Sequence, residues 1–143
     1  MKQMCMQRVN RSATGWLGSA VLLVLLAGCG GQRTNDSFVP SDATAREALQ
    51  AGLDAWKEGK PPGRVQAQSS TIQVVDSQWQ SGDRLENYEV VDAVPGDGPR
   101  QFSVRLTMKG GAGPKEVRFV IVGKDPIWVF RDTDYAQAST MGN

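Results

Sequence analysis

The sequence predicts an α+β fold, with one N-terminal amphipathic helix packed on a four- to five-stranded antiparallel meander sheet. Apolar residues recur at the helical period between positions 45 and 56, and short strand-like segments separated by Gly- and Pro-containing turns follow from position 71. One helix followed by a run of strands is the element order of an α+β domain. We expect this domain at residues 41–134, followed by a polar C-terminal tail at residues 135–143.

The first 28 residues have the pattern of a secretory signal. Basic residues Lys2, Arg8 and Arg11 precede an apolar run from position 16 to position 27. A helix that spans a membrane needs roughly 20 apolar residues, so this run is too short to cross comfortably. The residues that follow are polar, which favours cleavage over a transmembrane segment.

The apolar run ends in the segment Leu26-Ala27-Gly28-Cys29, which resembles the lipobox of a bacterial lipoprotein. The resemblance implies that signal peptidase recognises Leu26, Ala27 and Gly28, and that Cys29 becomes the acylated N-terminus, with palmitate among its acyl chains. Two or three acyl chains give a stable membrane anchor, whereas one gives only marginal binding. The expected location is therefore the cell envelope, as a membrane-anchored lipoprotein on the periplasmic or extracellular face. The alternative is an ordinary secretory signal with a coincidental cysteine.

Composition limits what the mature chain can do. Cys5 lies in the signal and Cys29 would be acylated, so we expect no disulfide and no free thiol. Without the signal the chain has 13 basic and 15 acidic residues, close to neutral and evenly spread. This gives no support for nucleic acid as a partner, nor for electrostatic attachment to anionic lipid.

Residues 29–40, the lipidated cysteine and a polar stretch, read as a flexible tether. Either Ser41 or Thr44 can cap the helix that follows. Gly59 and the Pro-Pro pair at positions 61 and 62 end it. Gly52 falls on the apolar stripe, where a missing side chain would let a sheet approach closely. The stripe consists of Ala45, Ala48, Leu49, Gly52, Leu53 and Trp56.

Strand signals continue along the rest of the chain, separated by turns. The clearest is at residues 101–109, where Phe102, Val104, Leu106 and Met108 alternate with polar residues, as expected of a strand with one buried face. From position 132 onward polarity rises and we expect fraying. The other predicted strands are residues 71–76, 85–94, 116–122 and 127–131.

The order of these elements, with the segment Leu53-Asp54-Ala55-Trp56-Lys57-Glu58-Gly59 closing the helix, resembles the cystatin-like and ketosteroid-isomerase-like α+β roll superfamily. It is similar above all to small lipoproteins that carry such a domain. The resemblance covers residues 41–134 and implies a curved sheet with one face on the helix. Proteins of one fold serve many functions, so the resemblance implies little about activity.

The chain lacks the residues that most catalytic and metal-binding sites require. There is no histidine, which removes His-based triads and most transition-metal sites. Asp132-Thr133-Asp134 begins like a calcium loop, but Ala136 occupies the next ligand position. The glycine-rich segments at residues 96–98 and 110–113 lack the strand-to-helix context of a phosphate cradle and read as turns. We expect no metal and no cofactor.

Enzymes of the roll superfamily use an Asp as base and a Tyr or protonated acid as donor, in a pocket between sheet and helices. The residues that could take these parts are Asp76 and Tyr88, with Trp79 as an apolar wall. The alternative is structural: Tyr88 and Trp79 fill core or rim, and Asp76 caps a turn. Trp128, on the last strand, is as consistent with core as with a contact surface.

A cystatin-type protease inhibitor is a less favoured alternative. The segment Gln73-Val74-Val75-Asp76-Ser77 begins like the inhibitory loop but lacks the glycine at its bend. The function that the sequence favours is a lipid-anchored cell-envelope protein with a non-catalytic binding or protein-interaction domain. Its expected partners are the membrane, through the acyl chains, and an unidentified envelope protein or small ligand, with a homodimer through the sheet as a further option.

Overall fold

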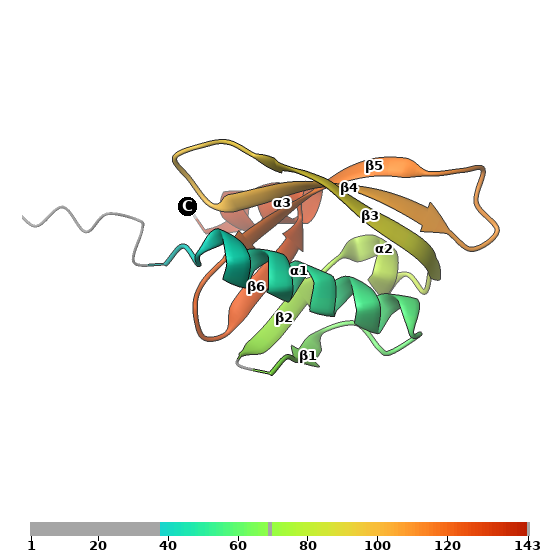
Figure 1. The fold of residues 1–143 in the computed structure, drawn as a ribbon, viewed down its shortest axis with the longest axis horizontal. Helices are drawn as coiled ribbons and strands as arrows, with labels where there is room; N and C mark the ends of the chain where they lie inside the picture. Colours follow the sequence, from blue (N-terminus) through green and yellow to red (C-terminus); the bar gives the residue numbers. More distant parts are fainter. Residues whose placement is uncertain (1–37, 69, 143) are drawn as a thin grey trace, which may run out of the picture. The chain divides into compact units, whose positions relative to one another are not determined.

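The computed structural model describes residues 38–68 and 70–142. The signal, the lipobox with Cys29 and most of the tether lie outside these residues. The described part is an α+β domain, as predicted (Figure 1). Its elements are α1 (Asp42–Lys57), β1 (Arg64–Gln66), β2 (Thr71–Val75), α2 (Ser77–Gln80), β3 (Leu85–Val94), β4 (Arg100–Met108), β5 (Lys115–Val122), β6 (Ile127–Arg131) and α3 (Asp132–Met141).

The six strands form one mixed sheet in the order β1-β2-β6-β5-β4-β3. β2 and β6 are parallel, with Ile72 beside Ile127 and Val74 beside Val129, and all other neighbours are antiparallel. The prediction of four or five antiparallel strands in a meander was therefore wrong in strand number and in this pairing. β1 has only three residues and no apolar alternation, so its sequence gave no strand signal.

Helix α1 forms as its sequence predicts. Ser41 is the N-cap, and its hydroxyl accepts a hydrogen bond from the Thr44 backbone N–H at 3.2 Å, so Thr44 is not the cap. The chain leaves the helix through Gly59, whose φ of +76° favours glycine. Every residue of the predicted stripe is buried. A Cβ at Gly52 would lie 3.0 Å from the Val74 Cγ2 atom, so the missing side chain does allow close approach of β2.

The hydrophobic core lies between α1 and the face of the sheet that curls around it (Figure 1). Alternate residues of each strand point into it, for example Ile127 and Val129 on β6 and Phe102, Val104 and Leu106 on β4. Within the described residues, the buried members of this core belong to residues 45–129. Its largest fully buried side chains are Trp56, Phe102, Phe119, Leu49, Ile72, Leu106, Ile121 and Ile127.

The expectation of a fraying end from position 132 was wrong, because residues 132–141 form helix α3. Asp132 and Asp134 lie in its first turn, where carboxylates stabilise a helix through its dipole. The Tyr135 ring meets the Phe130 ring edge-on at 5.6 Å between centroids, which holds the helix against β6. α3 has no pronounced apolar face of its own, which is why periodicity did not reveal it.

Candidate functional site

Asp76 lies where β2 ends and the short helix α2 begins, and it is 1% exposed. One carboxylate oxygen, Oδ1, accepts hydrogen bonds from the backbone N–H groups of Gln78 and Trp79, both at 2.9 Å. The other, Oδ2, accepts from Arg131 Nε at 3.0 Å and lies 2.9 Å from Arg131 Nη2. Both oxygens of this carboxylate are therefore occupied by protein donors.

The partner of Asp76 is Arg131, the last residue of β6, whose side chain is 9% exposed. Its Nη2 also donates to Gln78 Oε1 at 3.0 Å, and its guanidinium lies 5.8 Å from the centre of the Phe119 ring. Asp134 extends the cluster, since its carboxylate accepts from the Ser77 backbone N–H at 2.8 Å. The cluster joins α2, β6 and α3, and it holds the ends of these elements together.

Trp79 packs inside the domain against Trp56 of α1, with ring centroids 5.6 Å apart and planes 14° from parallel. Each indole N–H has a backbone partner: Trp79 Nε1 donates to the Lys60 carbonyl at 3.1 Å, and Trp56 Nε1 donates to the Asp83 carbonyl at 2.7 Å. Buried indoles with satisfied N–H groups are structural anchors. Trp79 therefore closes the core rather than lining an open site.

Tyr88, on β3, is half-buried at the rim of the core. Its hydroxyl donates to Asp54 Oδ1 of α1 at 2.7 Å. Burial, and then the hydrogen bond and negative charge of Asp54, raise the pKa of Tyr88 well above its usual range. The phenol is thus held protonated, with its proton directed at Asp54.

Asp76 and Trp79 share a narrow space between α1 and the sheet, but Tyr88 does not line it. This space has no volume for a water molecule. A drug-sized ligand needs a pocket of about 300 Å³ or more, so no substrate fits beside Asp76. The residues that line the space are Leu49, Gly52, Leu53, Trp56, Val74, Asp76, Trp79, Phe119 and Val129.

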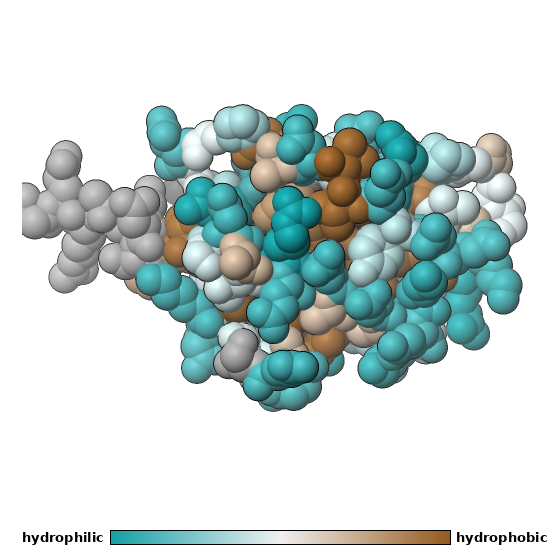
Figure 2. Space-filling model, in the orientation of Figure 1, coloured by the Kyte–Doolittle hydropathy of each residue, from teal (hydrophilic) through white to brown (hydrophobic). Residues whose placement is uncertain are grey.

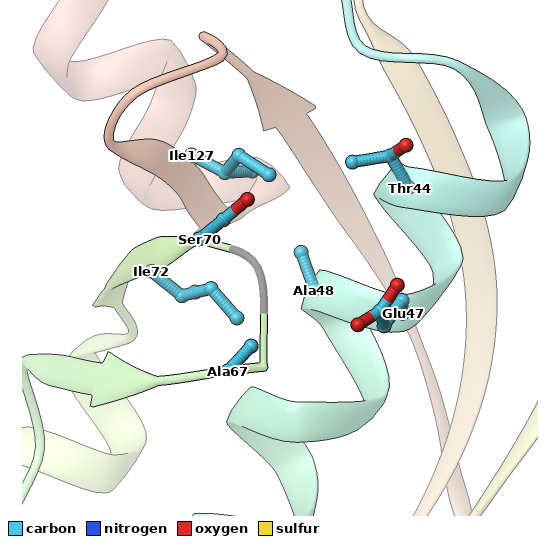
Figure 3. A pocket seen from close by; sticks show the side chains of 7 residues that line it. All are labelled: Thr44, Glu47, Ala48, Ala67, Ser70, Ile72 and Ile127. Atoms are coloured by element: carbon cyan, nitrogen blue, oxygen red, sulfur yellow. The ribbon is translucent and has the colours of Figure 1, made fainter.

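A second space near α1 lies between the helix, the β1–β2 connection and the start of β6 (Figure 3). Its volume is about 10 Å³, which is room for about one water molecule. Glu47 and Thr44 from α1 lie at its rim, and apolar side chains such as Ile72 and Ile127 form its opposite wall (Figure 3). It is a packing defect too small for a ligand.

The segment compared with a cystatin loop does not form a loop. Gln73, Val74 and Val75 belong to β2, which pairs with β1 on one side and with β6 on the other. Asp76 and Ser77 then start α2. Residues 73–75 are paired with strands on both sides, where they cannot enter a protease cleft.

Aromatic residues gather instead on the outer face of the sheet, opposite α1. Trp128 and Phe130 of β6 stack with centroids 5.7 Å apart, and Phe130 in turn contacts Tyr135 of α3. Phe130 and Tyr135 are half-buried, whereas Trp128 is 37% exposed. The alternation along β6 could have predicted this face for Trp128, because Ile127 and Val129 fill the core from the other side.

Trp128 also borders an open groove of about 590 Å³ at the turn between β5 and β6. Phe38, the first described residue, lies across it with 71% of its surface exposed. The Phe38 carbonyl accepts a hydrogen bond from the Gly123 N–H at 2.7 Å, so the entering chain is fixed to this turn. The groove is lined by Phe38, Val122, Gly123, Lys124, Asp125, Pro126 and Trp128.

A smaller groove of about 250 Å³ lies at the turn between β3 and β4. Arg100 borders it but is already engaged, because its Nε donates to the Pro40 carbonyl at 3.1 Å and lies 3.0 Å from Asp42 Oδ1. Asp42 also lines the groove, and the rest of the lining, from Ala93 to Gly96 and from Pro99 to Phe102, carries no other charged side chain. The two charged groups of this groove, Arg100 and Asp42, are therefore paired with each other.

The face that carries α1 is mostly hydrophilic, apart from a hydrophobic patch over β3 and β4 (Figure 2). β3 carries Val90, half-buried against the core, and Val91, which is 42% exposed. α1 therefore leaves the β3 side of the sheet partly uncovered.

Within residues 38–68 and 70–142, no group of three or more Asp, Glu or other metal-ligating side chains could hold a metal ion. In the same part of the chain, the helices are too short or too polar to cross a membrane. No protein-family model, curated protein or solved structure matches this chain. Its function must therefore be argued from its own residues.

Proposed function

We propose that this protein is a membrane-anchored lipoprotein of the cell envelope whose single α+β domain binds a partner without catalysing a reaction. The anchor is supported by the order of the basic region, the apolar run and the segment Leu26-Ala27-Gly28-Cys29. Acylation of Cys29 would hold the domain at the membrane on a tether that ends at Phe38.

The proposal of a non-catalytic function rests on the hydrogen bonding and burial of the Asp76 carboxylate. A general base needs a free oxygen within reach of a substrate proton. Both oxygens of Asp76 accept protein hydrogen bonds, and the space beside it has no volume for water. Tyr88, the other candidate, donates to Asp54 at the rim. This arrangement supports a structural role for each of the candidate catalytic residues.

A binding function is supported by the outer face of the sheet. Stacked Trp128 and Phe130, together with the open groove beside Phe38, present aromatic surface to solvent, whereas most large apolar residues of the described domain are buried. Exposed aromatic surface of this kind is typical of contact sites. The proposed roll relationship is consistent with one long helix laid across a curled sheet, and it remains a proposal.

The anchor is tested by mass spectrometry of the N-terminal peptide of the protein purified from its native membrane. We expect a peptide that begins at acylated Cys29, and we expect a Cys29→Ser variant to yield no acylated peptide. Cys5→Ser is the matched control, because it removes the other cysteine without touching the lipobox. Unmodified Cys29, or a chain that still begins at Met1, would overturn the proposed anchor.

A further inference from the structure

Exposed hydrophobic residues are concentrated at one end of the domain. Of the four large hydrophobic side chains that are exposed in the described residues, Phe38 and Trp128 border the groove at the β5–β6 turn. Met141, 74% exposed, ends α3, whose C-terminal end lies at the left of Figure 1, where the chain also enters α1. Only Val91, in the middle of β3, lies elsewhere.

We propose that this end of the domain contacts the lipid bilayer directly, with Phe38, Pro126 and Trp128 in the lipid–water interface and Lys124 at the headgroups. These four residues are called the β5–β6 surface below. The inference rests on the proposed acyl anchor and goes beyond it, because an anchored domain could equally stand clear of the membrane. Contact of the β5–β6 surface with lipid would fix the orientation of the domain on the bilayer.

The point where the chain enters the domain favours this orientation. The Gly123 N–H holds the Phe38 carbonyl at the β5–β6 turn, so a tether from Cys29 arrives at this surface. The eight residues between Cys29 and Phe38 span at most about 26–29 Å when fully extended. Strand β5 also has eight residues, so the opposite β4–β5 turn lies about 27 Å farther away. If that turn pointed straight at the bilayer, Phe38 would stand about 27 Å above the membrane, which takes nearly the whole extended length of the tether.

The chemistry of the surface suits a membrane interface. Tryptophan is enriched at the headgroup level of membranes, where its ring is apolar and its N–H remains hydrated. Trp128 is held in place by the stacked ring of Phe130 beneath it. Lysine can place its stem along apolar surface while its ammonium stays among headgroups, and Lys124 is exposed beside Pro126. The near-neutral charge of the mature chain gives no support for attraction to anionic lipid.

The tether itself is a poor occupant for the groove. The residues at positions 30–37 are Gly, Gly, Gln, Arg, Thr, Asn, Asp and Ser, which have no apolar side chain to offer. A second protein bound to Trp128 is the remaining competitor, and the experiment below distinguishes it from lipid.

The tryptophans of the mature chain make the test selective. Trp56 and Trp79 are 2% and 4% exposed, so Trp128 is the tryptophan that an external quencher reaches. The lipoprotein, purified from its membrane with acylated Cys29 verified by mass spectrometry, is reconstituted alone into phosphatidylcholine vesicles with brominated acyl chains. We expect loss of Trp128 emission, a blue shift of the residual accessible emission, and loss of acrylamide quenching relative to the mature chain, residues 29–143, prepared without acyl chains in solution.

Two variants sharpen the result. In a Trp128→Phe, Ala112→Trp double variant the accessible tryptophan moves to the β4–β5 turn, where Ala112 is exposed at the other end of the sheet. We expect brominated lipid to quench it much less than Trp128. Phe38→Ser removes the most exposed aromatic side chain of the surface without touching the core, and we expect it to lower lipid quenching of Trp128.

The possible results distinguish the proposed bilayer contact from the proposed acyl anchor at Cys29. If Cys29 is acylated but Trp128 and the tryptophan at position 112 are quenched equally by lipid, the β5–β6 surface is overturned and the anchor stands. If Trp128 is protected from acrylamide in native membranes but is neither protected nor quenched in pure lipid vesicles, its partner is a protein, and the bilayer contact is overturned. A bare Cys29 overturns both.

Discussion

The carboxylate of Asp76 and the guanidinium of Arg131, 55 positions apart in the sequence, form a buried ion pair with Oδ2 and Nη2 separated by 2.9 Å. The pair joins the end of β2 to the end of β6, the two strands that lie parallel in the middle of the sheet. Two backbone N–H groups of α2 donate hydrogen bonds to the other carboxylate oxygen of Asp76. Asp76 therefore acts as a structural junction in this fold.

Removing the charge of Asp76 is expected to destabilise the domain strongly. An Asp76→Ala variant leaves Arg131 buried without its partner and deprives α2 of its cap. Breaking a buried ion pair in this way costs about 3–5 kcal/mol. The measurement is the free energy of unfolding from urea titration followed by circular dichroism.

The matched control is the exposed pair of Glu89 and Arg105, on neighbouring strands β3 and β4. Their side chains are 64% and 44% exposed, so Glu89→Ala should cost only about 0–1 kcal/mol. Equal losses in the two variants would contradict a special role for Asp76.

Gly52→Ala is expected to destabilise the domain even though alanine is the better helix former. Alanine in a helix interior gains about 1 kcal/mol over glycine. Here its Cβ would lie 3.0 Å from Val74 Cγ2 in a tightly packed layer, and overpacking of a core costs about 1–3 kcal/mol. In a double-mutant cycle measured by urea unfolding, Val74→Ala should relieve the penalty. Additive effects of the two substitutions would show that the contact does not limit the packing.

Tyr88 should ionise at a higher pH than an ordinary tyrosine, because burial and Asp54 both oppose its negative charge. Tyr135→Phe leaves Tyr88 as the sole tyrosine, so ultraviolet absorbance of the phenolate follows it alone. The folded state binds the phenolic proton more tightly than the unfolded state. Its contribution to stability is therefore complete below about pH 10 and is lost as the pH rises through the raised pKa. Asp54→Asn should lower that pKa; an unchanged titration would contradict the coupling.

Gly123→Ala is expected to cost more stability than Gly82→Ala. Both glycines have left-handed φ values, +82° and +94°, where a Cβ costs roughly 1–2 kcal/mol. A Cβ at Gly82 would meet nothing within 4 Å, whereas one at Gly123 would lie 2.7 Å from the Pro126 carbonyl oxygen. Comparison of the two urea midpoints separates the contact from the backbone conformation. Equal midpoints would indicate that the β5–β6 turn adjusts freely.

The sequence predicted those elements whose pattern is local. Helix α1 and strands β3 and β6 lie within the expected ranges, because apolar period and Gly or Pro boundaries specify them directly. The parallel pairing of β2 with β6 was not predicted, since pairing between distant strands leaves no periodic signal in either. β1 and α3 were missed because neither has an apolar stripe of its own. Both elements form because of their contacts with the rest of the domain.

The candidate site residues could be chosen from the sequence by residue type, but their structural roles became clear only from their contacts. Asp76, Trp79 and Tyr88 could be singled out because carboxyl, indole and phenol groups are the reactive or anchoring types in a chain without histidine. Sequence alone could not show that Arg131 neutralises Asp76, because the two residues meet only through the parallel strands. Nor could it place Phe38 beside Trp128, since a backbone hydrogen bond to Gly123 brings them together.

The position of β6 has a consequence for how the chain reaches its final state. This strand lies between β2 and β5, yet it follows the other five described strands in the sequence. Until residues 127–131 emerge, the N-terminal hairpin of β1 and β2 has no connection to the rest of the sheet. Contacts between distant segments form slowly. For a protein that we propose to be exported, such late closure would keep the polypeptide unfolded enough for translocation until β6 has been made.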